Sequence, residues 1–242
     1  MRLKVIGTGS SGNCYAITAS GETLLLDAGI QDKKIKRAIE TLPVGCLITH
    51  EHMDHAKSAK KLARIGIPVY ASAGTFEAIG FNGGQVVESM KYYKIGGYTV
   101  LPFETQHDAT EPLGFLIRND KSKETLVYAT DTYYLKYTFP GVNCWLIECN
   151  YMDDVAEAQM ESGEIGENLY HRLNGSHMSL RRLAITLKAN DLTDTRAIIL
   201  IHLSDGRSDE RQMIKTIRDE TGISEVFAAK EGMDLSVALT PF

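Results

Sequence analysis

The sequence lacks the long apolar run that a membrane-spanning helix needs, because no stretch approaches about 18 consecutive hydrophobic residues. It also lacks a basic surplus, since 26 Lys and Arg stand against 31 Asp and Glu for a formal net charge of -5. A protein whose main partner is long nucleic acid usually carries excess positive charge. The composition therefore favours a small or short substrate and no membrane, and a local basic patch stays open.

Cysteine is scarce, and no C-x-x-C pair occurs among Cys14, Cys46, Cys144 and Cys149. This excludes a disulfide framework and argues against a cysteine zinc site, so we expect buried thiols in a reducing compartment. The first residues reach glycine too early for a signal peptide. The expected location is the cytoplasm, either of a bacterium or of its host if a phage encodes the chain.

Strand-like and helix-like segments are mixed along all 242 residues, with no linker, low-complexity run or short repeat. The strands are expected over 2–7, 13–20, 22–29, 44–49, 67–72, 98–105, 113–119, 125–130, 142–149, 195–203, 225–230 and 234–240. The helices are expected over 31–42, 54–66, 179–190 and 208–222, with one or two more between 150 and 175. The pattern predicts an α/β protein with a single domain over 1–242, built from two packed sheets with outer helices.

A glycine-rich motif, G-x-G-x-x-G at 7–12, follows the first predicted strand, and Asp27 lies at the distance of a ribose-binding acid. A dinucleotide site needs a helix that begins in this loop. The next segment, "NCYAITAS", is β-branched and aromatic and predicts a second strand. We therefore expect a tight hairpin and no nucleotide cofactor.

The stretch "ITHEHMDH" at 48–55 concentrates three of the seven histidines behind an apolar strand. In extended chain, His50 and His52 point the same way and can reach one metal ion. Asp54 and His55 follow as the chain turns into a helix and can reach a second ion nearby. Such nitrogen and oxygen ligands suit zinc, manganese or iron. A solvated loop that happens to be rich in histidine is the alternative.

Three more ligand-type residues stand where apolar strands end. His107 follows the strand "TVLPFET", Asp131 follows "TLVYAT", and His202 ends "TRAIILI". Each alone could be a capping or core residue. Together they predict the remaining ligands, because polar residues at strand ends are where sites collect.

These motifs resemble the metallo-β-lactamase fold superfamily, whose signature is H-x-H-x-D-H. "LLLDAG" and "ATDT" are similar to its early aspartate strand and its bridging-aspartate strand. The resemblance covers nearly the whole chain and implies a four-layer αββα sandwich that binds two divalent ions, zinc or manganese. It also implies a first metal held by His50, His52 and His107, a second held by Asp54, His55 and His202, Asp131 as the bridge, and Asp27 as the residue that orients ligands.

Within the superfamily, "GSSGN", "QHDA", "SHMS" and "IHLS" resemble the WalJ (YycJ) group and the phage anti-Pycsar phosphodiesterases. The chain departs from the WalJ pattern at Tyr151, at Leu180 and at residues 205–207. These departures put DNA processing in doubt more than they affect the metal ligands. The resemblance implies a homodimer and a phosphodiesterase that degrades cyclic nucleotides, with a WalJ-like DNA or RNA exonuclease as the alternative.

The expected mechanism is a two-metal hydrolysis, in which Asp54 orients the attacking hydroxide and the metals neutralise charge on the phosphate. His177, in "GSHMS", is the candidate to protonate the leaving oxygen or bind phosphate. Its alternative role is to cap the helix that begins near Ser179. A thioester or lactam hydrolase and a non-catalytic metal protein are further alternatives.

An aromatic cluster surrounds the predicted Asp131 loop and the next strand. Its members are Tyr133, Tyr134, Tyr137, Phe139 and Tyr151. Aromatic rings at such a place can stack on a base. They can equally pack in a core or a dimer interface.

Overall fold

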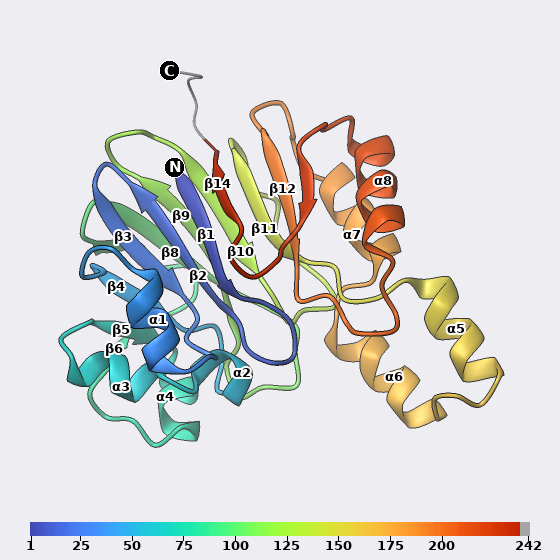
Figure 1. Cartoon of the computed structure of the whole chain (residues 1–242), viewed down its shortest axis with the longest axis horizontal. Coiled ribbons are helices and arrows are strands. Elements are labelled where there is room, and N and C mark those ends of the chain that lie inside the picture. Colours follow the sequence, from blue (N-terminus) through green and yellow to red (C-terminus); the bar gives the residue numbers. More distant parts are fainter. Residues whose placement is uncertain (238–242) are drawn as a thin grey trace.

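The computed structural model describes residues 1–237 and arranges them as two β-sheets packed face to face, with helices on both outer sides (Figure 1). This is the four-layer αββα sandwich that the sequence predicts. The strand predicted over 234–240 begins as expected, while its residues 238–240 lie outside the described part of the chain.

The first sheet has the strand order β14-β1-β2-β3-β4-β5-β6. In that order the strands span Asp234–Ser236, Arg2–Gly7, Cys14–Ala19, Glu22–Leu26, Gly45–Leu47, Val69–Ala71 and Gln85–Val86. Pairing is antiparallel from β14 to β3 and parallel from β3 to β6. The segments that follow β3 and β4 therefore leave the same edge of the sheet.

The second sheet has the strand order β13-β12-β11-β10-β9-β8-β7. In that order the strands span Val226–Ala228, Ala197–Ile201, Cys144–Glu148, Thr125–Ala129, Leu113–Asn119, Tyr98–Glu104 and Tyr93–Ile95. Strands β10 to β13 are parallel, and β8 runs in their direction because both β8 and β10 pair antiparallel with β9. The chain thus leaves β8, β10, β11 and β12 at one edge.

Helices cover the outer face of each sheet. On the first sheet these are α1 (Asp32–Ala38), α2 (Met53–Ala56), α3 (Ala59–Arg64) and α4 (Ala73–Ala78). On the second sheet they are α7 (Leu180–Lys188) and α8 (Glu210–Thr221). The two inner sheet faces meet in a core that contains Tyr15, Phe115 and Tyr128. Central strands such as β11 and β12 are buried along their whole length, which explains their continuous apolar sequences.

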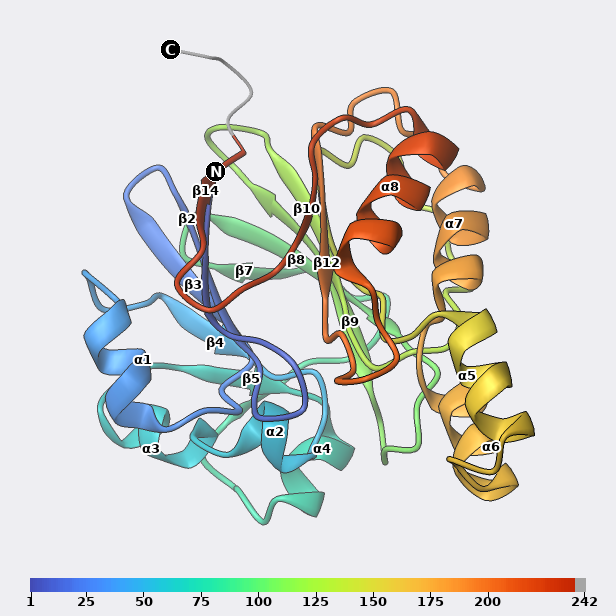
Figure 2. The ribbon, with the colours of Figure 1, turned by 45° about the vertical axis from the view of Figure 1, so that its right-hand side comes forward.

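A helical hairpin of α5 (Asp153–Glu161) and α6 (Glu167–Ser176) stands beside the sandwich (Figure 2). It packs around a small core of its own that includes Tyr151, Ala156 and Leu173. This corresponds to the one or two helices predicted between 150 and 175. The end of α6 returns the chain to the edge where β8, β10, β11 and β12 finish.

The helix predicted over 54–66 is wrong as a single element, because it is divided into α2 and α3. At the break, Ser58 donates its backbone N–H to Ala28 and its hydroxyl to the carbonyl of Ile30, at 2.6 Å. These tertiary bonds replace helical ones. The sequence also gave no signal for α4, whose N-cap is Ser72, or for the short edge strands β6 and β7.

The glycine-rich segment at 7–12 joins β1 to β2 as an antiparallel hairpin, which confirms the prediction of a turn without a helix. All four cysteines are free and buried. Burial raises the pKa of the Cys144 thiol to about 12, so it stays protonated and unreactive. No helix within residues 1–237 is both long and apolar enough to cross a membrane.

Replacing Tyr98 by Phe is expected to destabilise the fold by about 1–3 kcal/mol, because the Tyr98 hydroxyl ties the two sheets together. It accepts from Ala19 N at 2.9 Å and donates to the carbonyl of Glu22 at 2.7 Å. The measurement is urea unfolding at equilibrium. Tyr92→Phe is the control, because Tyr92 is 73% exposed. Equal stability of the two variants would contradict this role.

Candidate metal centre

The ends of four strands deliver ligand-type side chains to one place between the sheets. His50 follows β4 by three residues, His107 follows β8 by three, Asp131 follows β10 by two, and His202 follows β12 directly. Each apolar strand carries its chain through the core and releases it at the same edge. The resulting polar cluster is deeply buried: His50 is 1% exposed, Asp131 3% and His202 5%.

The backbone is strained at two of these residues, Asp131 and His202, and at Asp27, which directly follows β3. Asp27, Asp131 and His202 have φ angles of 58°, 48° and 54°, in the left-handed region that non-glycine residues rarely occupy. Such strain persists only where the surroundings hold it, and it concentrates at functional sites. Here it turns each side chain toward the cluster.

The turn at residues 53–55 can pack against residue 29 only because residue 29 is glycine. A Cβ at Gly29 would lie 1.6 Å from the carbonyl oxygen of Asp54. Backbone bonds run from Asn13 N to Asp54 O at 2.7 Å and from Ala28 N to His55 O at 2.7 Å. The "LLLDAG" segment thus forms the floor on which the 53–55 turn rests.

Hydrogen bonds at the outer nitrogens fix the orientation of the histidine rings. His55 Nδ1 contacts Asp27 Oδ2 at 2.7 Å, His202 Nδ1 contacts Glu148 Oε1 at 3.0 Å, and His107 Nδ1 contacts the Ser176 carbonyl at 3.0 Å. An Nδ1–H that donates to such an acceptor leaves Nε2 as the nitrogen that can bind a metal. Each Nε2 faces the interior of the cluster, where that of His55 lies 3.0 Å from Asp131 Oδ2.

Asp27 is the fully buried hub of this outer layer. Its carboxylate accepts from the backbone N–H and hydroxyl of Thr49 and from the hydroxyl of Tyr128, the last at 2.5 Å. Burial raises the pKa of Tyr128 well above its ordinary value, so the phenol keeps its proton and remains a donor. Asp27 therefore orients His55, as the resemblance implies.

The structure brings all seven predicted ligands together. Their donor atoms form three overlapping groups, in each of which all members lie within 4.8 Å of one another. The groups are His50, His52 and His107; Asp54, His55 and His202; and His50, His55 and Asp131. The first two are the predicted pair of triads, and Asp131 lies between them. The role of each side chain as a ligand stays a prediction.

The donor set fits metal ions better than it fits hydrogen bonds within the protein. His52 Nδ1 faces two other ring nitrogens, His50 Nε2 at 3.0 Å and His107 Nε2 at 3.3 Å. One ring nitrogen cannot satisfy both contacts as a neutral hydrogen-bonding group. His202 Nε2 is buried and makes no hydrogen bond to any described residue. Cations at the points where these lone pairs converge would satisfy them all, so the cluster is compatible with a dinuclear metal site.

Protonation favours metal binding in the first triad. Burial lowers the pKa of His50 well below its ordinary value and lowers that of His107 as well, so both rings are neutral near pH 7. Burial alone would raise the pKa of Asp131, but the neighbouring His202 and His55 hold it well below the ordinary range. Neutral imidazole and ionised carboxylate are the forms that coordinate metal.

Glu148 is a site residue that sequence reasoning missed. It ends β11, is completely buried, and accepts from Thr132 N and Met178 N, both at 3.0 Å. Its Oε1 contacts the ring nitrogens of His177 at 2.7 Å and His202 at 3.0 Å. A signal was present in the sequence, since a glutamate in the apolar strand "CWLIE" needs buried partners.

His177, predicted to act in catalysis, lies at the edge of the cluster. Its side chain is 19% exposed, and its ring stacks on that of His202 with centroids 5.5 Å apart. Burial would lower the pKa of His177, but the carboxylate of Glu148 outweighs it and raises that pKa. The alternative of helix capping is wrong, because Ser179 caps α7 by accepting from Arg182 N.

The aromatic cluster predicted around Asp131 divides into several environments. Phe139 packs in the core, with its ring centroid 4.7 Å from that of Phe103 and 6.1 Å from that of Trp145. Tyr151 is buried and donates to Asn174 Oδ1 at 2.8 Å. Tyr134 is 53% exposed.

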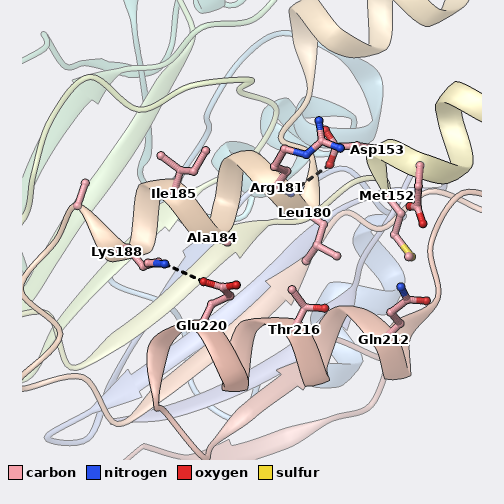
Figure 3. Close-up of a pocket in the computed structure, with 12 residues that line it drawn as sticks. Met152, Asp153, Leu180, Arg181, Ala184, Ile185, Lys188, Gln212, Thr216 and Glu220 are labelled. Carbon is pink, nitrogen blue, oxygen red and sulfur yellow. Dashed lines mark hydrogen bonds and ion pairs between the residues drawn. The ribbon is translucent and has the colours of Figure 1, made fainter.

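A groove of about 640 Å³ lies apart from the cluster, between α7 and α8 (Figure 3). Its floor includes Leu180 and Ala184, and an ion pair of 2.8 Å between Lys188 and Glu220 crosses one end. No residue of the metal cluster lines it. The groove therefore has no part in the chemistry of the site.

Comparison with known proteins identifies the class. The family model described as the beta-lactamase superfamily domain matches residues 23–203. The chain belongs to this superfamily, and it is a metal-dependent hydrolase of the metallo-β-lactamase fold.

Particular relatives extend over the whole chain. It is 29% identical to exodeoxyribonuclease YycJ of Bacillus anthracis, over 94% of this chain and 93% of the relative. It is also 29% identical to exodeoxyribonuclease WalJ of Streptococcus pneumoniae, over 96% and 90% of the two chains. Among solved structures, the metallo-beta-lactamase fold protein YhfI of Bacillus subtilis superposes with a TM-score of 0.73 at 18% identity, covering 97% of this chain and 98% of that one.

We expect the purified protein to bind two divalent ions per chain when it is dialysed against zinc or manganese. His202→Ala should bind one, because it removes a donor from the second triad and leaves the first intact. Elemental analysis by plasma mass spectrometry measures both numbers. His171→Ala is the control, because His171 is exposed on α6. Two ions in His202→Ala, or none in the wild type, would contradict this arrangement.

Proposed function

We propose that this hydrolase cleaves phosphodiester bonds of nucleotides. The observation that carries the proposal is the overlap of the two triads through His50, His55 and Asp131, which holds two donor sets side by side. The nitrogen and oxygen donors suit zinc or manganese. Two such ions would supply the positive charge that stabilises a phosphoryl-transfer transition state. A single triad would support simpler Lewis-acid chemistry.

Asp54 is the residue proposed to orient the attacking water. Its side chain is 29% exposed, the most open of the carboxylates in the cluster. Burial alone would raise its pKa, but contacts with His202 and His55 lower it, so the group is ionised and accepts hydrogen bonds. A water that donates to this carboxylate has its oxygen lone pair directed at the substrate.

His177 is proposed to protonate the leaving oxygen, with Glu148 as its positioning residue. Their 2.7 Å contact joins Nδ1 to Oε1 and turns Nε2 away from the buried carboxylate. The partial exposure of His177 lets Nε2 approach a bound substrate. Glu148 itself is sealed from solvent, so it acts through the two rings that its Oε1 contacts, those of His177 and His202.

The substrate that the relatives support is the end of a DNA strand. Both curated relatives are named exodeoxyribonucleases, and the alignments span at least 94% of this chain. The net charge of -5 disfavours binding of a long nucleic acid. It is a smaller obstacle for an exonuclease, which needs to hold only a few nucleotides. We therefore propose strand ends as the first candidate.

A cyclic mononucleotide, which the sequence alone favours, is the second candidate. Its support is the acidic hairpin beside the site, where α5 and the turn that follows it contain no Lys or Arg. The acids there are Asp153, Asp154, Glu157, Glu161 and Glu164. Negative charge beside the site disfavours a long polyanion and admits a small one. Degradation of a nucleotide immune signal, a homodimer and a cytoplasmic location belong to this candidate as predictions.

A substrate panel separates the two candidates. Metal-loaded protein should release nucleotides from short single-stranded DNA, and Asp54→Asn should reduce kcat at least a hundredfold, because the attacking water and the second metal site both lose the negative charge of this carboxylate. Chromatography of the products measures both. Cyclic mononucleotides, cyclic dinucleotides, RNA and a lactam complete the panel. Turnover of cyclic nucleotides without DNA would select the second candidate, and turnover of the lactam alone would contradict a phosphodiesterase.

Glu148→Gln and His177→Gln should each lower kcat on DNA about 10- to 100-fold. The double variant should lose little more, because the two residues act as a unit. Bis(p-nitrophenyl) phosphate should be affected much less, since p-nitrophenolate leaves without protonation. Additive losses in the double variant, or equal losses on both substrates, would assign Glu148 and His177 a structural role.

A further inference from the structure

A second pocket lies beside helix α7 and plays no part in the mechanism above. It has a volume of about 280 Å³ and lies between the segment after Asp131 and helix α7. Its lining includes Tyr134, Lys136, Tyr137, Arg182, Ile185 and Asn190. Tyr134 is three residues from Asp131, so the pocket begins within about 10 Å of the cluster.

Hydrogen bonds connect the wall of this pocket to the metal centre. Thr132 donates its backbone N–H to Glu148 Oε2 at 3.0 Å and its hydroxyl to the Tyr134 carbonyl at 2.7 Å. The backbone N–H of Tyr133 donates to the carbonyl of Gln106, the residue before His107. These hydrogen bonds fix the position of the pocket wall relative to the metal cluster.

Arg182 is the charged group of this pocket. Its guanidinium lies 5.6 Å from the ring centroid of Tyr133, and one of its N–H groups donates to the Asn174 carbonyl. No carboxylate of residues 1–237 forms an ion pair with it, whereas the neighbouring Arg181 approaches Glu157 at 3.9 Å. Most of its five donors remain available in the planar arrangement that matches a phosphate.

Apolar and aromatic surface stands beside this charge. Tyr134 is 53% exposed and Ile185 is 64% exposed, although both are large side chains that favour burial. Ile185, on α7, lines both this pocket and the groove between α7 and α8 (Figure 3). Lys136 adds a second cation, 5.2 Å from the ring of Tyr137, and pairs with Glu104. Cations beside exposed aromatic surface are the combination that binds single-stranded nucleic acid.

We propose that this pocket binds the nucleotide next to the scissile phosphodiester, with its phosphate on Arg182 and its base against Tyr134 and Ile185. The inference rests on the proposed phosphodiesterase function and favours one of its two candidate substrates. A strand with at least one further nucleotide would fill the pocket, whereas a cyclic mononucleotide would not. The hydrolase thus has a second subsite that favours linear single strands.

A second copy of the chain is a less suitable occupant. A two-fold interface on this face would join two copies of a patch that carries both Arg182 and Lys136. Among residues 1–237, Glu104 is the only acid that forms an ion pair with either cation, so it neutralises one of the two charges. A phosphate removes that repulsion and a second copy adds to it.

The test measures binding without turnover. A fluorescein-labelled short thymidine strand is titrated with protein in EDTA, and fluorescence anisotropy gives Kd. Arg182→Gln should weaken binding at least fivefold and reduce the slope of log Kd against log salt by about 0.7, the value for one phosphate contact on a single strand. Tyr134→Ser should weaken binding at least threefold, and because Tyr134 is exposed this variant tests the pocket without risk to folding.

Lys215→Gln is the matched control, since it also removes one positive charge but lies 79% exposed on α8. The expected result is wild-type Kd and salt slope. With metal present, the ratio of kcat/KM for the strand to that for bis(p-nitrophenyl) phosphate should fall at least fivefold in Arg182→Gln. Light scattering gives the oligomeric state of each variant.

The outcomes separate the inference from the proposed function. If the wild type cleaves the strand but Arg182→Gln and Tyr134→Ser bind it as Lys215→Gln does, the subsite is wrong and the phosphodiesterase stands. If the same two variants change the oligomeric state instead of strand affinity, the face is a dimer interface and the inference is overturned. If the wild type cleaves no phosphodiester, the proposed function fails and the subsite fails with it.

Discussion

The approach of imidazole nitrogens to one another is the constraint on which the site depends. His52 Nδ1 lies 3.0 and 3.3 Å from the nitrogens of His50 and His107, and buried lone pairs so placed repel each other unless a cation lies among them. The rings of His50 and His107 cannot readily rotate away, because their outer nitrogens contact the Thr49 hydroxyl and the Ser176 carbonyl, each at 3.0 Å. Folding therefore holds together a set of nitrogen donors that metal ions would satisfy better than hydrogen bonds within the protein do.

The sandwich makes this arrangement possible. Its strands β4, β8, β10 and β12 are rigid apolar elements that end at one edge, so the ligands are positioned by the core and not by flexible loops. Strained backbone at Asp27, Asp131 and His202 then turns the side chains inward. His177 and the Arg182 pocket lie toward the same edge, so the proposed metal ions, acid and second nucleotide subsite would share one rim.

Local chemistry in the sequence predicted most of the strands and the His and Asp side chains that gather where they end, because apolar runs that end in His or Asp leave few other interpretations. It did not predict Glu148, whose partners His177 and His202 are distant in sequence and meet it only in the fold. The break at Ser58 was equally invisible, since the bonds to Ala28 and Ile30 that cause it are tertiary. The substrate was hardest to predict, because the net charge of the whole chain conceals a cation such as Arg182, which forms no ion pair with a carboxylate of residues 1–237.

Anomalous diffraction from a crystal of the metal-loaded protein tests the central claim most directly. The account predicts two peaks about 3.5–4 Å apart. One should lie among the ring nitrogens of His50, His52 and His107, and the other among the donors of Asp54, His55 and His202. A single peak, or peaks away from these side chains, would contradict it.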